Sequence, residues 1–349
     1  MAGLMIILGT FVGLMFITQI VFFEISRNKV LKAHNYICFM SFDKPFSYHR
    51  YGYMFVLCLI CYVLKSPGPM FTMDWFLNFV LFLALGIVGD ILVQYLSLVY
   101  AKVRCRSQIE EGHLLENELQ EISQTMYQDF ENIEEEVKSF EEIDYLKKYF
   151  TNQSHLAYIC VDQGKFVKEH GVFNEATFDV EPYSDLDLTR RNLEGTPVQV
   201  TQLTSSNLMP FKDDKLDIVM CQYSNYDKLE VQRVLKRDGL FIVHQNGTSN
   251  FKEFLQMYMP YGMKGTWDAF SCAQTLEDIG MHIVDKVEDY RTVRFRSLQA
   301  IHTYFMKYSP DLADINKYKV FYMNALKSIK EHSFYELTTH QFLVVAKKA

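Results

Sequence analysis

The sequence has no excess of positive charge and no cysteine framework. Its 35 Lys and Arg residues are outnumbered by 42 Asp and Glu residues, which gives a formal net charge of -7. A nucleic-acid-binding domain needs a basic surface to neutralise phosphates, so this balance argues against nucleic acid as a partner. The seven cysteines are odd in number and lack the spacing of a disulfide scaffold, which favours a reducing compartment.

Motifs for metal binding and for hydrolysis are also missing. Cys58 and Cys61 form a CxxC inside an apolar run, and no second CxxC completes a zinc site. We interpret the pair as membrane-buried thiols rather than as metal or redox ligands, and we expect no metal. The sequence shows no Ser-His-Asp set and no phosphate loop, which disfavours hydrolases and nucleotidases.

What is present first is a strongly apolar N-terminal region. Three apolar stretches cover residues 3–23, 51–64 and 75–100. The first and third are long enough to cross a hydrocarbon core of ~30 Å as helices. Basic residues gather in 24–50 and just after 101, so the positive-inside rule predicts an outside N-terminus and a cytoplasmic C-terminal part. We therefore expect a multi-pass membrane domain of three helices over residues 1–106.

Two features inside the apolar stretches, a GxxxG motif and an acidic residue, have possible roles besides membrane anchoring. Gly9 and Gly13 form a GxxxG, which lets helix backbones approach closely, either within the chain or in a dimer. Asp90 lies in the third stretch, where an ionised carboxylate is costly. This residue either reaches the interface or is a partnered, functional acid.

Residues 107–150 are acidic, with apolar residues at steps of three and four from Leu115 to Phe140. This spacing is close to a heptad seam with one stutter and predicts a long amphipathic or coiled-coil helix. The helix is expected to pair with itself near the membrane and to dock on the following domain near 137–150. A homodimer through this stalk or through the GxxxG follows as an expectation, and a protein partner is also considered.

Residues 151–349 alternate between short apolar strands and helices. The strands are expected at 156–161, 175–180, 198–203, 216–221 and 240–245, followed by longer β-rich segments at 281–295 and 335–348. Alternation of this kind predicts an α/β fold with a parallel, doubly wound sheet, ended here by an antiparallel pair.

Two segments carry a resemblance to a known family. Residues 209–219 (MPFKDDKLDIV) and 230–239 (EVQRVLKRDG) resemble the entry to strand four and the turn before strand five of class I S-adenosylmethionine (SAM) methyltransferases. Trp267 and the segments 276–283, 294–305 and 338–348 are similar, in the same order, to motifs of a bacterial methyltransferase family. The resemblance implies a Rossmann-like fold over 151–349 and SAM as the cofactor.

The glycine-rich loop that this family uses to hold SAM is incomplete. Residues 158–166 read YICVDQGKF, in which only Gly164 occupies a motif glycine position and Asp162 is the alternative acid. Glycines allow the backbone of this loop to approach a ligand closely, and in this sequence residues with side chains occupy the other glycine positions.

Other ligand positions of the family also differ. Phe178 stands where an acid would bind the ribose, with Asp179 or Glu181 as possible substitutes. The end of strand three keeps Ser205 as a hydrogen-bonding side chain but lacks the usual acid. On the resemblance, the candidate cofactor-binding residues are Asp162, Gly164, Asp179 and Ser205.

Two side chains are candidates for catalysis if the domain is active. Tyr223 follows strand four, and His244 lies at the end of strand five, where the acceptor pocket of this fold is expected. A core or rim histidine is the alternative interpretation of His244, and His340 is interpreted as structural.

Two functions remain open on this basis. The first is a membrane-tethered, non-catalytic scaffold or sensor with a degraded SAM site, in which Tyr158 or Phe178 fills the pocket. The second is an active methyltransferase on a lipid or another membrane-associated small molecule. A basic stretch with Arg291, Arg294 and Arg296 either holds an anionic ligand or pairs with the acidic segment.

Overall fold

The computed structural model describes residues 2–32, 62–63, 72–160, 162–181, 186–203, 208–258 and 265–349. Cys58, Cys61 and most of the predicted second span lie outside these residues. The chain divides into two compact units, Met1–Phe130 with Ser297–Ser333, and Glu131–Arg296 with Phe334–Ala349.

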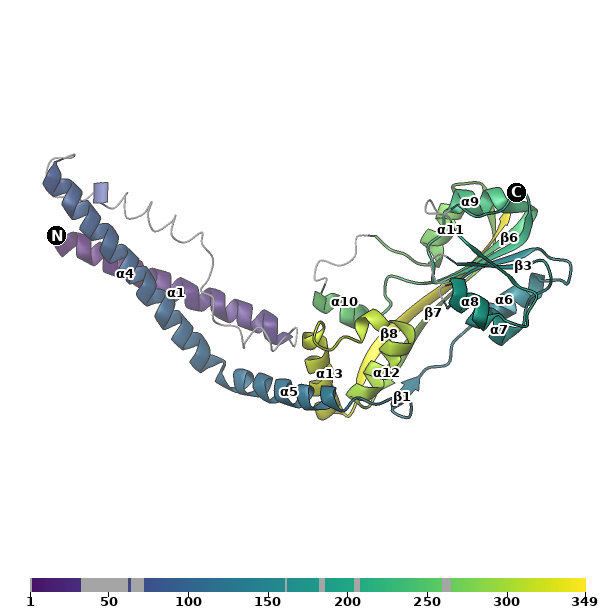
Figure 1. Cartoon of the computed structure of the whole chain (residues 1–349). Coiled ribbons are helices and arrows are strands. Elements are labelled where there is room, and N and C mark those ends of the chain that lie inside the picture. Colours follow the sequence, from purple (N-terminus) through teal and green to yellow (C-terminus); the bar gives the residue numbers. More distant parts are fainter. Residues whose placement is uncertain are drawn as a thin grey trace. The chain divides into compact units, whose positions relative to one another are not determined.

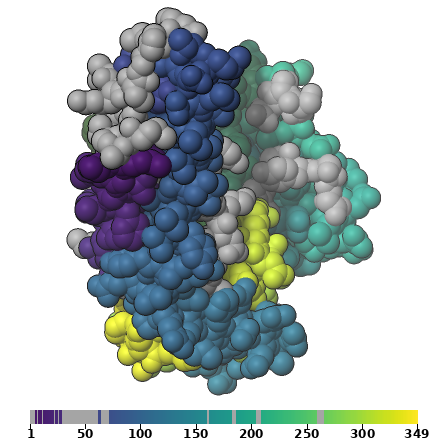
Figure 2. Space-filling model, turned by 90° about the vertical axis from the view of Figure 1, so that its left-hand side faces the viewer, coloured from purple at the N-terminus to yellow at the C-terminus, as the bar shows by residue number. Residues whose placement is uncertain are grey.

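The first unit is helical. Its elements are α1 (Ala2–Lys32), α4 (Met73–Arg104), α5 (Arg106–Gln124), α12 (Leu298–Tyr308), the 3-10 turn η1 (Pro310–Leu312) and α13 (Lys319–His332). By length and composition, α1 and α4 are the two described helices that could cross a membrane. They lie side by side (Figures 1 and 2).

Contacts between α1 and α4 advance in the same direction along both helices. A Cβ at Gly89 would lie 2.8 Å from Val12 Cγ2, and further along the Tyr100 hydroxyl donates to Glu24 Oε1 at 3.0 Å. The two helices are therefore parallel. Asp90 is buried in α4, where it accepts a hydrogen bond from Gln94 Nε2 at 2.7 Å.

The acidic segment does not form one long helix, so the prediction of a continuous or coiled-coil helix over 107–150 is wrong. Helix α5 ends at Gln124, and the chain continues as β1 (Ile133–Glu135) and then α6 (Glu142–Tyr149). The physical reason is tertiary pairing, because β1 adds to the sheet edge along β7 (Met281–Phe295). Strand pairing and its ion pairs override the helical spacing of the apolar residues.

These ion pairs settle the role of the basic stretch. Arg291 Nη1 lies 2.6 Å from Glu135 Oε1, and Arg296 Nη2 lies 2.7 Å from Glu134 Oε1. The Arg294 guanidinium also reaches Glu134, at 3.7 Å. The expectation that these arginines pair with the acidic segment is confirmed.

The apolar seam of α5 is used inside the first unit. Leu115 and Leu119 are 4% and 2% exposed. Beside them, Lys327 of α13 lies 2.7 Å from Glu111, and Lys330 lies 2.5 Å from Glu118. Helix α5 thus packs on α13 of its own chain, and the surface expected to form a homodimeric stalk is covered there.

The second unit is an α/β domain. Its remaining elements are β2 (Leu156–Cys160), α7 (Lys165–His170), β3 (Thr177–Glu181), α8 (Leu186–Asn192), β4 (Gln199–Gln202), β5 (Leu216–Gln222), α9 (Lys228–Val234), β6 (Leu235–Asn246), α10 (Lys252–Tyr258), α11 (Ala269–Glu277) and β8 (Tyr335–Lys348). The strand order is β1-β7-β8-β6-β5-β2-β3-β4.

Strands β2 to β6 are parallel, and β8 inserts antiparallel between β6 and β7. Apart from the added edge strand β1, this is the sheet of the class I methyltransferase fold. The prediction of a doubly wound sheet with antiparallel terminal strands is confirmed.

Helices cover both faces of the sheet (Figure 1). On one face, α9 and α11 pack on a core that contains Val219, Phe241 and Phe342. On the other, α6 and α7 pack on a core with Tyr158 and Ile242. Strand β5 is almost wholly buried, as expected for a parallel strand covered on both sides.

The two segments that resemble the methyltransferase family, 209–219 and 230–239, are joined by ion pairs and hydrogen bonds. Arg233 of α9 pairs with Glu230 at 2.5 Å and with Asp213 at 2.6 Å. Its guanidinium also donates to the Phe211 carbonyl at 2.9 Å, and the Met209 N–H donates to Glu230 at 2.8 Å. The two segments therefore hold the loop before β5 against α9.

Candidate functional site

The carboxyl ends of the parallel strands define the candidate site. In open α/β sheets, ligands bind in the crevice outside these ends. The residues expected there from the sequence lie within or just after β2, β3, β5 and β6, so the topology brings them towards one edge of the sheet.

The loop after β2 is closed by its own side chain. The Asp162 carboxylate accepts a hydrogen bond from the Phe166 N–H at the start of α7. Burial raises the pKa of this carboxyl. Asp162 therefore occupies a backbone donor that a glycine loop would leave to a ligand.

Gly164 is required by packing. It has φ +78°, and a Cβ there would lie 2.8 Å from Leu193 Cγ and 3.0 Å from Asp179 Oδ2. A left-handed backbone conformation and the lack of space both favour glycine at this position. The residue brings the loop close to Asp179 and to the helical layer above it.

Asp179 is a buried acid with unpaired oxygens. Its side chain is fully buried, and neither carboxylate oxygen has a hydrogen-bond partner among the described residues. Burial, followed by the nearby charges of Glu181 and Asp162, raises the pKa of Asp179 to about 8. This carboxyl is therefore mostly protonated at neutral pH.

The neighbours of Asp179 on β3 are engaged in structure. Glu181 accepts a hydrogen bond from Thr189 Oγ1 of α8 at 2.8 Å. Phe178 points to the opposite face, where its ring packs edge-on to Phe211 with centroids 4.8 Å apart. A partly buried aromatic ring thus packs against the core at the position where the family resemblance implies a ribose-binding acid.

Tyr158 and Ser205 complete the positions expected to meet SAM. Tyr158 is fully buried, and its hydroxyl donates to the Val172 carbonyl at 2.6 Å. Tyr158 is therefore a satisfied core residue. Ser205 lies outside the described residues.

Tyr223 and His244, at the ends of β5 and β6, contact each other. The Tyr223 hydroxyl lies 3.2 Å from His244 Nε2, and Gln341 Nε2 donates to the same hydroxyl at 2.8 Å. Tyr223 has φ +48°, which is uncommon for a bulky residue. Glu142 Oε1 lies 4.0 Å from His244 Nδ1.

Sequence reasoning missed Glu142 and Gln341. Glu142 lies in the acidic segment for which the sequence predicts a long amphipathic helix, and Gln341 lies in the terminal strand, more than a hundred residues from Tyr223. Neither residue carries a local pattern, so no signal in one sequence points to them.

The environment of His244 makes it a poor general base. Burial lowers its pKa to about 4, although the Glu142 carboxylate acts in the opposite direction. A general base works best with a pKa near the operating pH. This histidine is therefore neutral at pH 7, and its hydrogen bond with Tyr223 stabilises the junction of β5 and β6.

The state of His244 predicts an acid-sensitive fold. Its folded-state pKa of about 4 is below the unfolded value of about 6.5. The contribution of the neutral His244 to stability is therefore fully present above pH 6.5 and is lost as the pH falls towards 4, by about 3 kcal/mol at most. We expect His244→Phe to reduce this slope, measured by denaturant unfolding between pH 4 and 7. An unchanged slope would contradict the buried neutral histidine, and His282→Phe, on an exposed site of β7, serves as the control.

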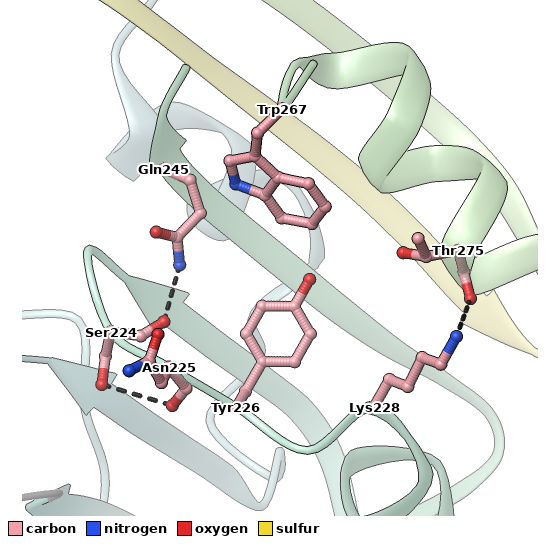
Figure 3. A pocket seen from close by; sticks show the side chains of 7 residues that line it. All are labelled: Ser224, Asn225, Tyr226, Lys228, Gln245, Trp267 and Thr275. Carbon is pink, nitrogen blue, oxygen red and sulfur yellow. Dashed lines mark hydrogen bonds between the residues drawn. The ribbon is translucent and has the colours of Figure 1, made fainter. Parts of the chain in front are cut away.

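A pocket opens beside this cluster, at the ends of β5 and β6 and on the face of α9 and α11 (Figure 3). Its volume is about 330 Å³, at the lower end of the range for small-molecule sites. It is lined by Ser224, Asn225, Tyr226, Lys228, Gln245, Trp267 and Thr275. Among the residues that the structure describes, no group of three His, Cys, Asp or Glu side chains is placed to hold a metal ion.

Comparisons with known proteins give structural neighbours only. No model of a known protein family matches the chain, and no curated protein sequence matches it. A candidate methyltransferase from Bacillus halodurans has 16% identity and a TM-score of 0.45, over 60% of this chain and 98% of that one. A SAM-dependent methyltransferase from Aquifex aeolicus has 12% identity and a TM-score of 0.37, over 60% and 90%.

A third neighbour is the [4+2]-cyclase SpnF, with 14% identity and a TM-score of 0.38 over 59% of this chain and 79% of that one. These identities and scores are too low to bear on activity. The fold assignment rests on the strand order and directions given above.

Proposed function

We propose that this protein is a membrane-anchored, cytoplasmic domain of methyltransferase fold that serves as a non-catalytic scaffold or ligand sensor. The observation that carries the proposal is the loop after β2. There the Asp162 carboxylate accepts a hydrogen bond from the Phe166 N–H. The Asp162 side chain therefore occupies a backbone donor that a SAM-binding loop would leave free for the ligand.

Strand β3 supports the same conclusion. Phe178, at the expected acid position, is partly buried and packs against Phe211 at the edge of the core. Asp179, the nearest substitute, has a pKa raised to about 8, so it is a neutral acid at pH 7. A ribose-binding residue would instead be a carboxylate that accepts hydrogen bonds from two hydroxyl groups of the ligand. Leaving such ligand hydroxyls unpaired costs about 1–3 kcal/mol each.

The helical unit supports the membrane anchor. Helices α1 and α4 are apolar and parallel, so a chain that crosses twice in one direction must return between the crossings. The sequence predicts such a return span in the apolar stretch 51–64. With the distribution of basic residues, this supports a multi-pass protein with its C-terminal part in the cytoplasm.

A homodimer remains part of the proposal, through α1 rather than through the acidic segment. A Cβ at Gly9 or Gly13 would meet no described atom within 4 Å, so this GxxxG face is open to a second copy. The apolar seam of α5, in contrast, is buried in its own unit.

The alternative function is an active SAM-dependent methyltransferase that acts on a lipid or membrane-associated small molecule. Two observations favour it, namely the unpaired carboxylate oxygens of Asp179 and the pocket at the ends of β5 and β6. In that case Tyr223 would be the side chain nearest to an acceptor, since it is 37% exposed while His244 lies behind it.

An activity assay tests the proposal. Membranes that contain the full chain are incubated with SAM labelled at its methyl group, and transfer to lipid, protein and small-molecule fractions is measured. We expect the same incorporation as in membranes that contain the Asp179→Asn variant. Label that depends on the native chain and is lost on Asp179→Asn or Tyr223→Phe would establish the alternative.

A further inference from the structure

The pocket on the face of α9 and α11 shares no residue with the candidate SAM site. Figure 3 shows the Tyr226 ring between the Lys228 and Gln245 side chains, with the Trp267 indole above it. None of Asp162, Gly164 or Asp179 lines this space. Ligand binding in this pocket can therefore be considered independently of SAM binding.

The charge of the pocket comes from one lysine. Lys228 Nζ donates to the Thr275 carbonyl at 3.1 Å, and it forms no ion pair with any carboxylate among the described residues. The neighbouring Asp227 is engaged with the N–H groups of Leu229 and Glu230 at 2.9 and 3.3 Å. The lining itself contains no Asp or Glu, so the ammonium group has donors left for an anion.

Two aromatic rings form the walls, and both are held in place. Tyr226 packs edge-on to Phe241 with centroids 4.9 Å apart. Trp267 packs edge-on to Phe342 at 5.8 Å, and its backbone N–H donates to Thr248 Oγ1 at 2.7 Å. Rings fixed in this way offer flat apolar surface at a small entropic cost.

Polar groups at the opposite side from Lys228 are neutral. Gln245 Nε2 donates to the Ser224 carbonyl at 2.8 Å, which fixes that amide and leaves its oxygen as an acceptor. The Asn225 side chain stands at the exposed rim. The pocket thus combines one cation, two aromatic walls and uncharged hydrogen-bonding groups.

We propose that this pocket binds a small planar anion, an aromatic or conjugated carboxylate, with the carboxylate on Lys228 and the ring between Tyr226 and Trp267. The proposal goes beyond the scaffold or sensor function by giving the domain a ligand class. A small ligand fits the volume of about 330 Å³, and a charge-assisted hydrogen bond to Lys228 supplies the selectivity for an anion.

The chain provides its own reporter for a test. It has two tryptophans, and the Trp75→Phe variant leaves Trp267 as the single fluorophore. The full-length variant in lipid nanodiscs is titrated with benzoate, and with benzamide as the neutral probe of the same shape. We expect a saturable change in fluorescence with benzoate, at a dissociation constant of about 1 mM or lower, and at least tenfold weaker binding of benzamide.

Lysine variants locate the anion. Lys228→Gln should weaken benzoate binding at least tenfold, Lys228→Arg should retain it, and Lys212→Gln, an exposed lysine outside the pocket, should leave it unchanged. Equal binding of benzoate and benzamide, or no saturable change up to about 10 mM benzoate, would overturn the proposal without any variant. Since SAM is absent from every arm, these results are independent of whether the domain binds SAM.

Discussion

Replacing Asp179 with asparagine should stabilise the α/β domain by about 5 kcal/mol at pH 8. The carboxyl is fully buried without a described hydrogen-bond partner, and its pKa is raised to about 8 from an unfolded value of about 3.9. The folded protein therefore keeps a proton that the unfolded chain releases. The contribution of this retained proton to stability is therefore full below pH 4 and falls as the pH rises towards 8. The asparagine variant has no such proton to lose.

Thermal unfolding of the full chain between pH 4 and 9 measures this effect. In the Trp75→Phe background, Trp267 fluorescence follows the domain in which Asp179 lies. The native and variant chains should unfold together at pH 4 and separate progressively towards pH 8. The control is Asp187→Asn, an exposed acid on α8, which should follow the native curve. A native curve that is flat from pH 5 to 9 would mean that Asp179 is ionised and satisfied, as a ligand-binding carboxylate would be.

Gly247→Ala should destabilise the same domain by about 3 kcal/mol or more. A Cβ at residue 247 would lie 1.9 Å from His340 Cε1. The His340 imidazole cannot move away from it without losing two contacts. It is 2.7 Å from Glu288 Oε1 and stacks on Tyr290 with centroids 4.1 Å apart. The structural role predicted for His340 is in keeping with these contacts.

A double-mutant cycle distinguishes a clash between a Cβ at residue 247 and His340 from a general effect of any substitution at Gly247. His340→Ala alone should cost stability, because it removes the hydrogen bond to Glu288 and leaves a cavity behind. In the His340→Ala background, however, Gly247→Ala should cost less than about 1 kcal/mol. Equal costs of Gly247→Ala in both backgrounds, measured by denaturant unfolding, would contradict the contact.

The fold was predictable from the sequence where local patterns and tertiary packing agree. The buried run Leu216–Gln222 and the segments around Arg233 mark β5 and α9 because their side chains serve the scaffold itself. Trp267 and His340 were found for the same reason. Residues of this kind report on the fold and carry no information on whether a ligand binds.

The errors arose where partners distant in sequence decide the structure. The apolar residues of 107–150 have helical spacing, yet Ile133–Glu135 pairs with Arg294 and its neighbours on β7. Glu142 approaches His244 from that same segment. Because these contacts join residues about a hundred or more positions apart, neither spacing nor composition could predict them.

The protonation states of the candidate site residues could not be predicted from the sequence. Tyr223 and His244 contact each other at the ends of β5 and β6. The low pKa of the histidine and the raised pKa of Asp179 depend on burial, which cannot be derived from residue identities. The proposal of a scaffold or sensor depends on these states as much as on the incomplete glycine loop.

The most direct test of the central claim is a calorimetric titration of SAM and S-adenosylhomocysteine into the full chain in lipid nanodiscs. The closed loop at Asp162 and the neutral Asp179 predict no saturable heat and no thermal shift at about 1 mM ligand. Micromolar binding that is lost on Asp179→Asn would contradict the account and identify the protein as a working methyltransferase site.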